Sequence, residues 1–209
     1  MNSYILDTKF AASGLIDLIS KEEKELQQLK NEHQKAEEEL RNKQYQYEES
    51  IYNIEDNMED MDVRQKHSEY LSYRQNVVKP LKDKITEITL SLEVKDASIR
   101  ALCGALLQIA KQGISTVHRG LTSCPDGRNI GAREKLKNVI WQARNQSMHY
   151  EESVHRPYFT PVINCFHNLV HDFGINYTLL TGNLSKEIIE LLQWKDYSDY
   201  EKDMVLLLG

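Results

Sequence analysis

The sequence predicts an all-α protein in which an antiparallel bundle of four to five helices follows a long N-terminal coiled-coil arm. Nine Gly and four Pro among 209 residues are too few for the many turns of an all-β chain. Residues 20–75 contain neither Gly nor Pro, and apolar residues recur at helical spacing through most of the chain. We therefore expect an acidic coiled-coil arm at residues 1–79 and a helical bundle at residues 80–209.

The arm is predicted from a seam of apolar and near-apolar positions that alternate three and four residues apart, with one stutter. A fully helical arm would be about 80 Å long at 1.5 Å per residue. A helix this thin cannot bury its seam alone, so it requires a partner, which is either a second copy or the next helix folded back. The seam positions are Leu26, Leu29, His33, Ala36, Leu40, Gln44, Tyr47, Ile51, Ile54, Met58 and Met61.

A helical restart is predicted at Lys79-Pro80, because proline is tolerated in the first turn of a helix. An apolar stripe continues from there to about Gly113. Residues 119–131 concentrate Gly, Pro, Ser and Asp and are predicted to form a loop, and a further helix is expected from about Ala132. The stripe comprises Leu81, Ile85, Ile88, Leu92, Ile99, Leu102, Cys103, Leu106, Ile109 and Ala110.

Two more helices are expected near the C-terminus. Thr160 and Pro161 are typical of a helix start, and Gly174 of a helix end. A last helix is predicted from about Leu184 to Gln193, and the tail beyond it gives no clear element. The apolar VLLL near the end is expected to pack against the bundle or a partner.

Charge is unevenly distributed along a chain whose formal net charge is −6. Residues 21–70 carry eight Lys or Arg and fifteen Asp or Glu, whereas residues 97–149 carry eight and two. A basic segment in an acidic protein is compatible with nucleic-acid binding, although such cations are also typical of solvated helix faces.

Composition also narrows the cellular setting. No apolar run approaches the roughly 18 residues needed to span a bilayer, and the N-terminal residues lack the pattern of a signal peptide. The three cysteines form no CxxC pair and predict neither a disulfide framework nor a zinc finger. We expect a cytoplasmic protein.

The helix expected from residue 132 ends in an arginine, an asparagine and a histidine at a recognisable spacing. Arg144 is followed by Asn145, and His149 stands five residues after the arginine, in WQARNQSMHYEE. This pattern resembles the R-x4-6-H signature of the HEPN superfamily. These small helical-bundle proteins include metal-independent endoribonucleases of toxin–antitoxin, abortive-infection and CRISPR-associated systems. The resemblance covers at most the residues from 80 onward, and it implies a homodimer whose two motifs line one cleft.

The helical spacing of the motif keeps its two main side chains apart within one ideal helix. Five residues along an ideal helix rotate by about 140° and rise by about 7.5 Å, so Arg144 and His149 do not share a face. Their side chains converge only if the helix ends or bulges near His149, or if a second subunit completes the site.

The residue types suit RNA cleavage without a metal or another cofactor. Histidine can take a proton from the ribose 2′-OH or give one to the leaving 5′-oxygen. Arginine can hold the scissile phosphate, and Asn145 can orient the phosphate or the imidazole. The products would be a 2′,3′-cyclic phosphate and a 5′-OH, and DNA would resist cleavage because it lacks the nucleophile. The cations expected to hold the RNA backbone are Lys111, Arg119, Arg128 and Arg133.

Other features carry weaker hypotheses. In HEPN toxins paired with a nucleotidyltransferase antitoxin, the motif often extends to a tyrosine two residues after the histidine. Here Tyr150 follows His149 directly and Glu151 takes that position, which argues against this mode of control. His167 and His171 have a spacing that can chelate a metal, but chance surface placement is the preferred interpretation.

Two functions from different classes therefore remain in view. The first is a dimeric endoribonuclease of growth arrest or phage defence, with Arg144 and His149 catalytic and an antitoxin or regulator docked on the arm. The second is a non-catalytic coiled-coil adaptor whose HEPN-like bundle binds a protein or nucleotide. Expression toxicity that depends on His149 would favour the nuclease.

Overall fold

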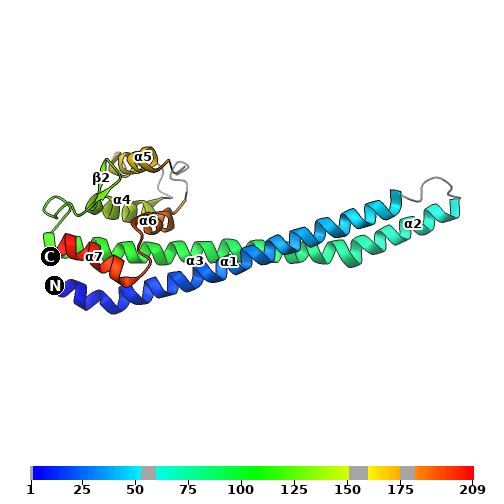
Figure 1. The fold of residues 1–209 in the computed structure, drawn as a ribbon, viewed down its shortest axis with the longest axis horizontal. Helices are drawn as coiled ribbons and strands as arrows, with labels where there is room; N and C mark the ends of the chain where they lie inside the picture. The colour runs from blue at the N-terminus through cyan, green and yellow to red at the C-terminus, as the bar shows by residue number, and fades with distance from the viewer. Residues whose placement is uncertain (1, 53–59, 151–159, 175–181) are drawn as a thin grey trace. The chain divides into compact units, whose positions relative to one another are not determined.

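The computed structural model describes residues 2–52, 60–150, 160–174 and 182–209, and it confirms the all-α class (Figure 1). Apart from one short strand pair, the regular elements of these residues are helices. No helix in these ranges is both long and apolar enough to cross a membrane. In order, the elements are α1 (Ser3–Tyr52), α2 (Asp60–Tyr73), a π-helical turn η2 (Arg74–Val78), α3 (Lys79–His118), β1 (Asn129–Ile130), β2 (Glu134–Lys135), α4 (Leu136–His149), α5 (Thr160–Phe173), α6 (Ser185–Leu192) and α7 (Tyr197–Leu208).

The chain divides into two compact units, which we call the hairpin unit and the core unit. The hairpin unit is Lys24–Asp96, and the core unit combines Met1–Glu23 with Ala97–Gly209. This division differs from the boundary at residues 79 and 80 that the sequence predicts. The beginning of α1 belongs to the core unit, and the beginning of α3 belongs to the hairpin unit.

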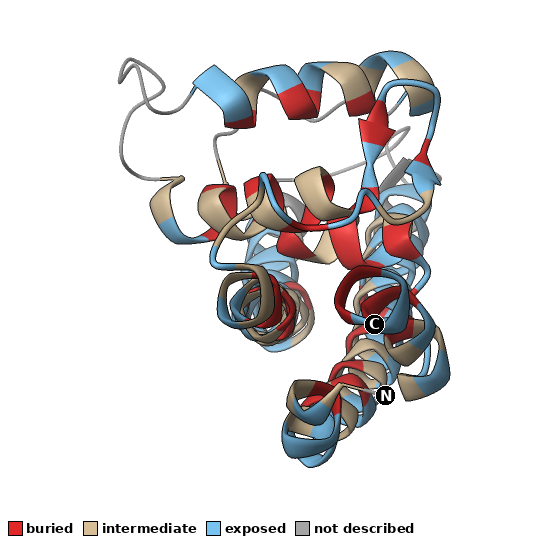
Figure 2. Ribbon diagram, turned by 90° about the vertical axis from the view of Figure 1, so that its left-hand side faces the viewer, coloured by how far each residue is buried: buried red, intermediate tan, exposed pale blue. Residues whose placement is uncertain are grey.

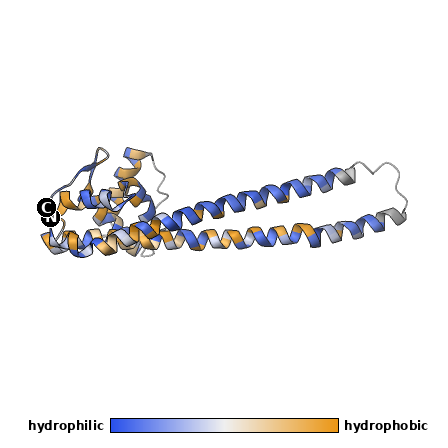
Figure 3. Ribbon diagram, turned by 60° about the horizontal axis from the view of Figure 1, so that its bottom comes forward, coloured by the Kyte–Doolittle hydropathy of each residue, from blue (hydrophilic) through white to orange (hydrophobic). Residues whose placement is uncertain are grey.

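The hairpin unit is an antiparallel helix pair, so the partner of the predicted seam is the same chain folded back. Glu25 of α1 forms an ion pair with Lys95 of α3 at 2.7 Å, and the His33 imidazole lies 3.0 Å from the Thr89 hydroxyl. Near the other end, the Tyr73 hydroxyl donates to the backbone oxygen of Lys43 at 2.6 Å. Figure 3 shows mostly hydrophilic colour on this pair, with hydrophobic residues at intervals.

The predicted seam of α1 is turned inward wherever its side chains are described. Leu26 and Ala36 are buried, and the other seam positions from Leu29 to Tyr47 are half-buried. The Tyr47 ring stacks on that of Tyr73, with centroids 4.2 Å apart and planes within 9°. The seam positions predicted at Ile54 and Met58 lie outside the described residues, and the side chains of Ile51 and Met61 are not described.

The predicted restart at Pro80 is a change of helical form rather than a break. The turn η2 closes with a bond from the Lys79 N–H to the Arg74 oxygen, one residue longer than an α-helical bond. Proline has no N–H to donate and crowds the preceding turn, so a local π-turn before it lets the helix continue.

The second half of α3 is the central helix of the core unit. A Cβ built on Gly104 would have the Ser147 hydroxyl oxygen of α4 as its nearest atom at 3.6 Å, and one built on Gly113 would lie 2.9 Å from Leu208 of α7. On another side, the Tyr4 hydroxyl of α1 donates to the Ile109 oxygen at 2.8 Å. Figure 2 shows the buried residues gathered on the inward sides of the helices. The most deeply buried α3 residues are Ile99, Cys103, Leu106, Leu107, Ala110 and Ile114.

The segment between α3 and α4 contains a small β-hairpin that the sequence analysis misses. Ile130 pairs with Glu134, and Asn129 pairs with Lys135, in antiparallel register. Gly131 has φ of +67° at the turn, a conformation that glycine adopts readily. The hairpin delays the start of α4 to Leu136, four residues after the predicted start at Ala132.

The predictions for the C-terminal helices are mostly confirmed. Helix α5 runs from Thr160 to Phe173, and the Gly174 N–H donates to the Val170 oxygen at 2.9 Å with a φ of +63°. Helix α6 falls within the predicted range. The unassigned tail forms α7, whose Asp196 side chain accepts a bond from the Asp199 N–H. Leu207 and Leu208 are buried within this chain, whereas Val205 and Leu206 are exposed, so only half of the apolar end packs against the core unit.

Candidate functional site

Helix α4 carries the Arg–Asn–His motif and is fixed in the core unit by its apolar side. Lys135 is extended just before the helix, and the Leu136 N–H donates to the Arg128 oxygen at 2.9 Å. The buried polar residue Gln146 donates to the Gly182 oxygen at 2.6 Å and accepts from the Leu184 N–H at 3.0 Å, which ties α4 to the start of α6. The buried residues of α4 are Leu136, Val139, Ile140, Gln142, Ala143, Gln146 and Ser147.

The motif occupies the remaining, outward arc of the helix. At about 100° per residue, Arg144 and His149 lie near the two edges of that arc, with Trp141, Asn145 and Met148 between them. All of these residues are half-buried except Met148, which is 58% exposed. Arg144 and His149 therefore both face away from the core of their own unit, but in directions about 140° apart.

Helix α4 stays regular through the histidine. His149 is its last residue, and Tyr150 after it still has right-handed helical angles, φ −60° and ψ −26°. The helix therefore ends at His149, as one predicted route to a joint site requires, but because His149 is still helical, it stays about 140° from Arg144 around the axis. Glu151 lies outside the described residues.

Arg144 is held by neutral amide groups. Its Nε donates to Gln108 Oε1 of α3, and one terminal nitrogen donates to Asn145 Oδ1 at the long distance of 3.5 Å. Amide oxygens orient a guanidinium without neutralising its charge. The arrangement thus presents a positioned cation on the outward arc.

Lys111 adds a second cation beside Arg144. Its ammonium lies 4.5 Å from the centre of the Trp141 ring, within the range of a cation–π contact. Burial, and then the positive charge of Arg144, lower the pKa of Lys111. Two cations and an indole from α3 and α4 thus form one surface, which we call the Arg144 face: Gln108, Lys111, Trp141, Arg144, Asn145 and Met148.

Arg128, another predicted RNA-binding residue, is used within the fold. Its guanidinium donates from Nε to Asp203 Oδ1 at 2.7 Å and from a terminal nitrogen to Oδ2 at 2.9 Å. The same nitrogen donates to the Leu192 oxygen at 2.8 Å, and the Trp194 indole N–H donates to Asp203 Oδ2 at 2.8 Å. Asp203 is buried, so Arg128 is the partner of a buried carboxylate in α7.

Arg133 is likewise paired within the core unit. Its guanidinium forms an ion pair with Asp172 of α5 and contacts the His171 ring. The Ala132 and Arg133 N–H groups also donate to Asp172 Oδ2, at 2.7 and 2.9 Å. Burial raises the pKa of Asp172, but these backbone bonds and the charge of Arg133 outweigh it and hold the pKa below its usual value.

The structure thus separates the four predicted RNA-binding cations. Lys111 belongs to the Arg144 face, whereas Arg128 and Arg133 hold α7 and α5. Arg119 is exposed just beyond α3, with a φ of +61°.

The histidine pair and the cysteines show no metal arrangement. In the described ranges, no group of three His, Cys, Asp or Glu side chains is placed to hold a metal ion. His171 contacts Arg133 instead. Cys103, Cys124 and Cys165 are buried, as expected for Cys103 from its place on the apolar stripe.

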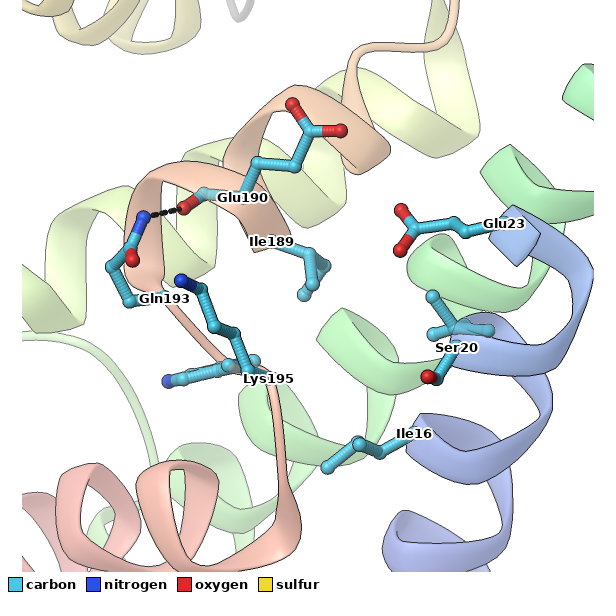
Figure 4. A pocket seen from close by; sticks show the side chains of 9 residues that line it. Ile16, Ser20, Glu23, Ile189, Glu190, Gln193 and Lys195 are labelled. Carbon is cyan, nitrogen blue, oxygen red and sulfur yellow. Dashed lines mark hydrogen bonds between the residues drawn. The ribbon is translucent and has the colours of Figure 1, made fainter. Parts of the chain in front are cut away.

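A hollow lies in the core unit, between α1 and the end of α6. It has a volume of about 400 Å³. Figure 4 shows Glu23 projecting from α1 toward α6, with Ile16 below it and Lys195 on the opposite side. Burial raises the pKa of Glu190 at its rim. None of the residues singled out from the sequence lines this hollow, and its walls mix apolar, acidic and basic groups without a recognisable catalytic arrangement.

Comparison with known proteins adds no relative. No family model, no curated protein and no solved structure matches the chain. The HEPN resemblance therefore rests on the motif and on its place in a helical unit.

Sequence reasoning missed three residues of the Arg144 face, Gln108, Trp141 and Met148. Trp141 precedes Arg144 by three residues, so the two side chains are neighbours on the helix surface. This spacing could have identified Trp141 from the sequence. Gln108 comes from α3, and no local spacing relates it to Arg144.

Proposed function

We propose that this protein is a metal-independent endoribonuclease whose active site is completed by a second copy of the chain. The observation that carries the proposal is the Arg144 face. A guanidinium is oriented by amide groups, a second cation lies beside it, and a histidine stands at the other edge of the same helical arc. The R-x4-H spacing and the following asparagine support the same reading through the HEPN resemblance, which also suggests growth arrest or phage defence.

In the proposed reaction, Arg144 of one copy and His149 of the other act on one scissile phosphate. A histidine takes the proton of the ribose 2′-OH as its oxygen attacks the phosphorus. The bond from phosphorus to the 5′-oxygen breaks, and that oxygen receives a proton, from an imidazolium or from water. Arg144 stabilises the charge that builds on the phosphate oxygens. The products are a 2′,3′-cyclic phosphate and a 5′-OH.

The test is RNA cleavage in EDTA by the wild type, Arg144→Ala and His149→Ala. We expect the wild type alone to cut and to leave cyclic-phosphate ends, with acid–base help worth about 10²–10⁴-fold lost in His149→Ala. The matching DNA strand serves as the substrate control. Cleavage that survives both substitutions, or that leaves 3′-OH ends, would refute the assignment.

A non-catalytic adaptor is the alternative, and one observation favours it. Within one chain, α4 stays regular and keeps Arg144 and His149 about 140° apart. Whether the protein is a nuclease or an adaptor, we propose the hairpin unit as the surface on which a regulator or antitoxin docks. Equal growth of cells expressing the wild type and His149→Ala would support the adaptor, and arrest by the wild type alone would support the nuclease.

A further inference from the structure

We propose that the Arg144 face binds single-stranded RNA by stacking an unpaired base on Trp141, while Lys111 and Arg144 hold the adjoining phosphates. The inference rests on the proposed function, because it names the form of RNA that the same site takes. It assigns a recognition role to Trp141, a residue outside the Arg–Asn–His motif.

Trp141 stands on the outward arc of α4 rather than in the core. It is half-buried, and its neighbours on the arc are Arg144, one turn along, and Met148, two turns along and 58% exposed. The other tryptophan of the chain, Trp194, is 3% exposed and donates to Asp203 in the interior. An indole on a polar helical surface, beside a largely exposed methionine, offers a flat apolar platform to a ligand from solvent.

The ligand that this platform fits is anionic as well as flat. The Lys111 ammonium lies 4.5 Å from the ring centre, and Arg144 stands one helical turn from the indole. Burial, and then the positive charge of Arg144, lower the pKa of Lys111, so the two cations lie close enough to repel each other. A phosphate bound between the two cations would relieve that repulsion. An anion is therefore favoured between Lys111 and Arg144, next to the Trp141 ring.

A base next to a phosphate combines both features. Proteins that bind single strands place aromatic side chains for bases to stack on beside cations that follow the backbone. In a duplex, the bases are stacked on one another and their faces are covered. Trp141 is therefore expected to select unpaired RNA.

The experiment measures binding without cleavage. A 12-nucleotide RNA with 2′-fluoro groups lacks the nucleophile, so it binds but is not cut. Tryptophan fluorescence is recorded during titration with this strand, alone or annealed to its complement. We expect quenching by the single strand, and weaker binding of the duplex. Trp141→Phe should abolish the quenching because Trp194 is buried.

Substitutions then test the stacking itself. Trp141→Leu should weaken binding of the single strand by about 5- to 150-fold, the range for loss of one stacked base. Trp141→Phe should stay within a few fold of the wild type, and its melting curve controls for misfolding. Lys111→Ala should lower the slope of log affinity against log salt by about 0.7 for one lost phosphate contact, whereas Lys82→Ala on the hairpin unit should leave the slope unchanged.

The outcomes separate this inference from the proposed function. If the single strand fails to quench, or if Trp141→Leu binds as the wild type does, the stacking role is wrong even where cleavage depends on His149. If stacking is found but no RNA is cut in EDTA, the Trp141 assignment stands and the nuclease assignment fails. Equal affinity for duplex and single strand would overturn the selection for unpaired RNA.

Discussion

Arg128→Ala is the substitution that most sharply separates cations that stabilise the fold from cations available to RNA. In the wild type, the Arg128 side chain makes three hydrogen bonds, two to Asp203 and one to the Leu192 oxygen. The Asp203 side chain is 6% exposed and that of Arg128 is 38% exposed. Alanine therefore leaves a buried carboxylate that has lost the arginine but still accepts from the Trp194 indole N–H.

The expected cost lies between those of buried and exposed ion pairs. Removing one partner of a fully buried pair costs about 3–5 kcal/mol, and an exposed pair is worth about 0–1 kcal/mol. Because Arg128 is partly exposed and Asp203 keeps one donor, we expect the free energy of unfolding to fall by about 2–3 kcal/mol. For a chain of this size, that corresponds to a melting temperature lower by roughly 5–10 °C.

The assay is thermal unfolding followed by circular dichroism, with two further variants. Asp203→Asn in the Arg128→Ala background removes the stranded charge, so the double variant should be more stable than Arg128→Ala alone. Lys202→Ala, in the exposed pair with Asp199, is the matched control and should change stability by less than about 0.5 kcal/mol. Wild-type melting of Arg128→Ala, or a double variant that is less stable still, would refute the reasoning.

Three other predictions concern the core unit. Gly113→Ala should be about 1–3 kcal/mol less stable than Gly104→Ala. A Cβ at Gly113 would lie 2.8 Å from the Tyr4 ring, whereas one at Gly104 has no neighbour nearer than 3.6 Å. Equal unfolding midpoints of the two variants in urea would contradict this. Because the folded-state pKa of Asp172 is lowered, its carboxylate stabilises the fold fully above the usual titration range, and this contribution is lost as the pH falls from that range through the lowered pKa. The melting temperatures of wild type and Asp172→Asn should therefore differ at pH 7 and converge below about pH 4, and a constant difference would be contrary evidence. All three cysteines are buried, and burial raises the pKa of Cys103 to about 12. A thiol reagent at pH 8 should therefore label none of them rapidly in the native protein and all three after denaturation. Rapid labelling of the native protein would contradict the burial of the cysteines.

The sequence was most informative where periodicity and helix-end residues act locally. The seam from Leu26 to Tyr47 and the helix between Thr160 and Gly174 follow from spacing and from residue preferences that need no distant contact. The β-hairpin could not be found that way. Its strands have two residues each, and it depends on Gly131 at the turn and on Asp172, forty residues away, which binds the turn's N–H groups.

The candidate site shows the same division between local and distant information. The spacing of Arg144 and His149 predicted that they would not share a face, and a regular α4 agrees. Composition could not tell which cations were free for RNA, because Arg128 and Arg133 look like Lys111 in the sequence. The distinction depends on Asp203 and Asp172, which reach them from other helices.

The central claim is that catalysis needs Arg144 of one copy and His149 of another, and subunit mixing tests it most directly. Arg144→Ala and His149→Ala proteins are unfolded together, refolded as a one-to-one mixture and assayed for RNA cleavage in EDTA. The mixed dimer holds one intact arginine and one intact histidine on different chains. The account predicts that each variant is inactive alone and that the mixture regains a substantial part of wild-type cleavage. An active wild type whose two variants stay inactive when mixed would contradict it.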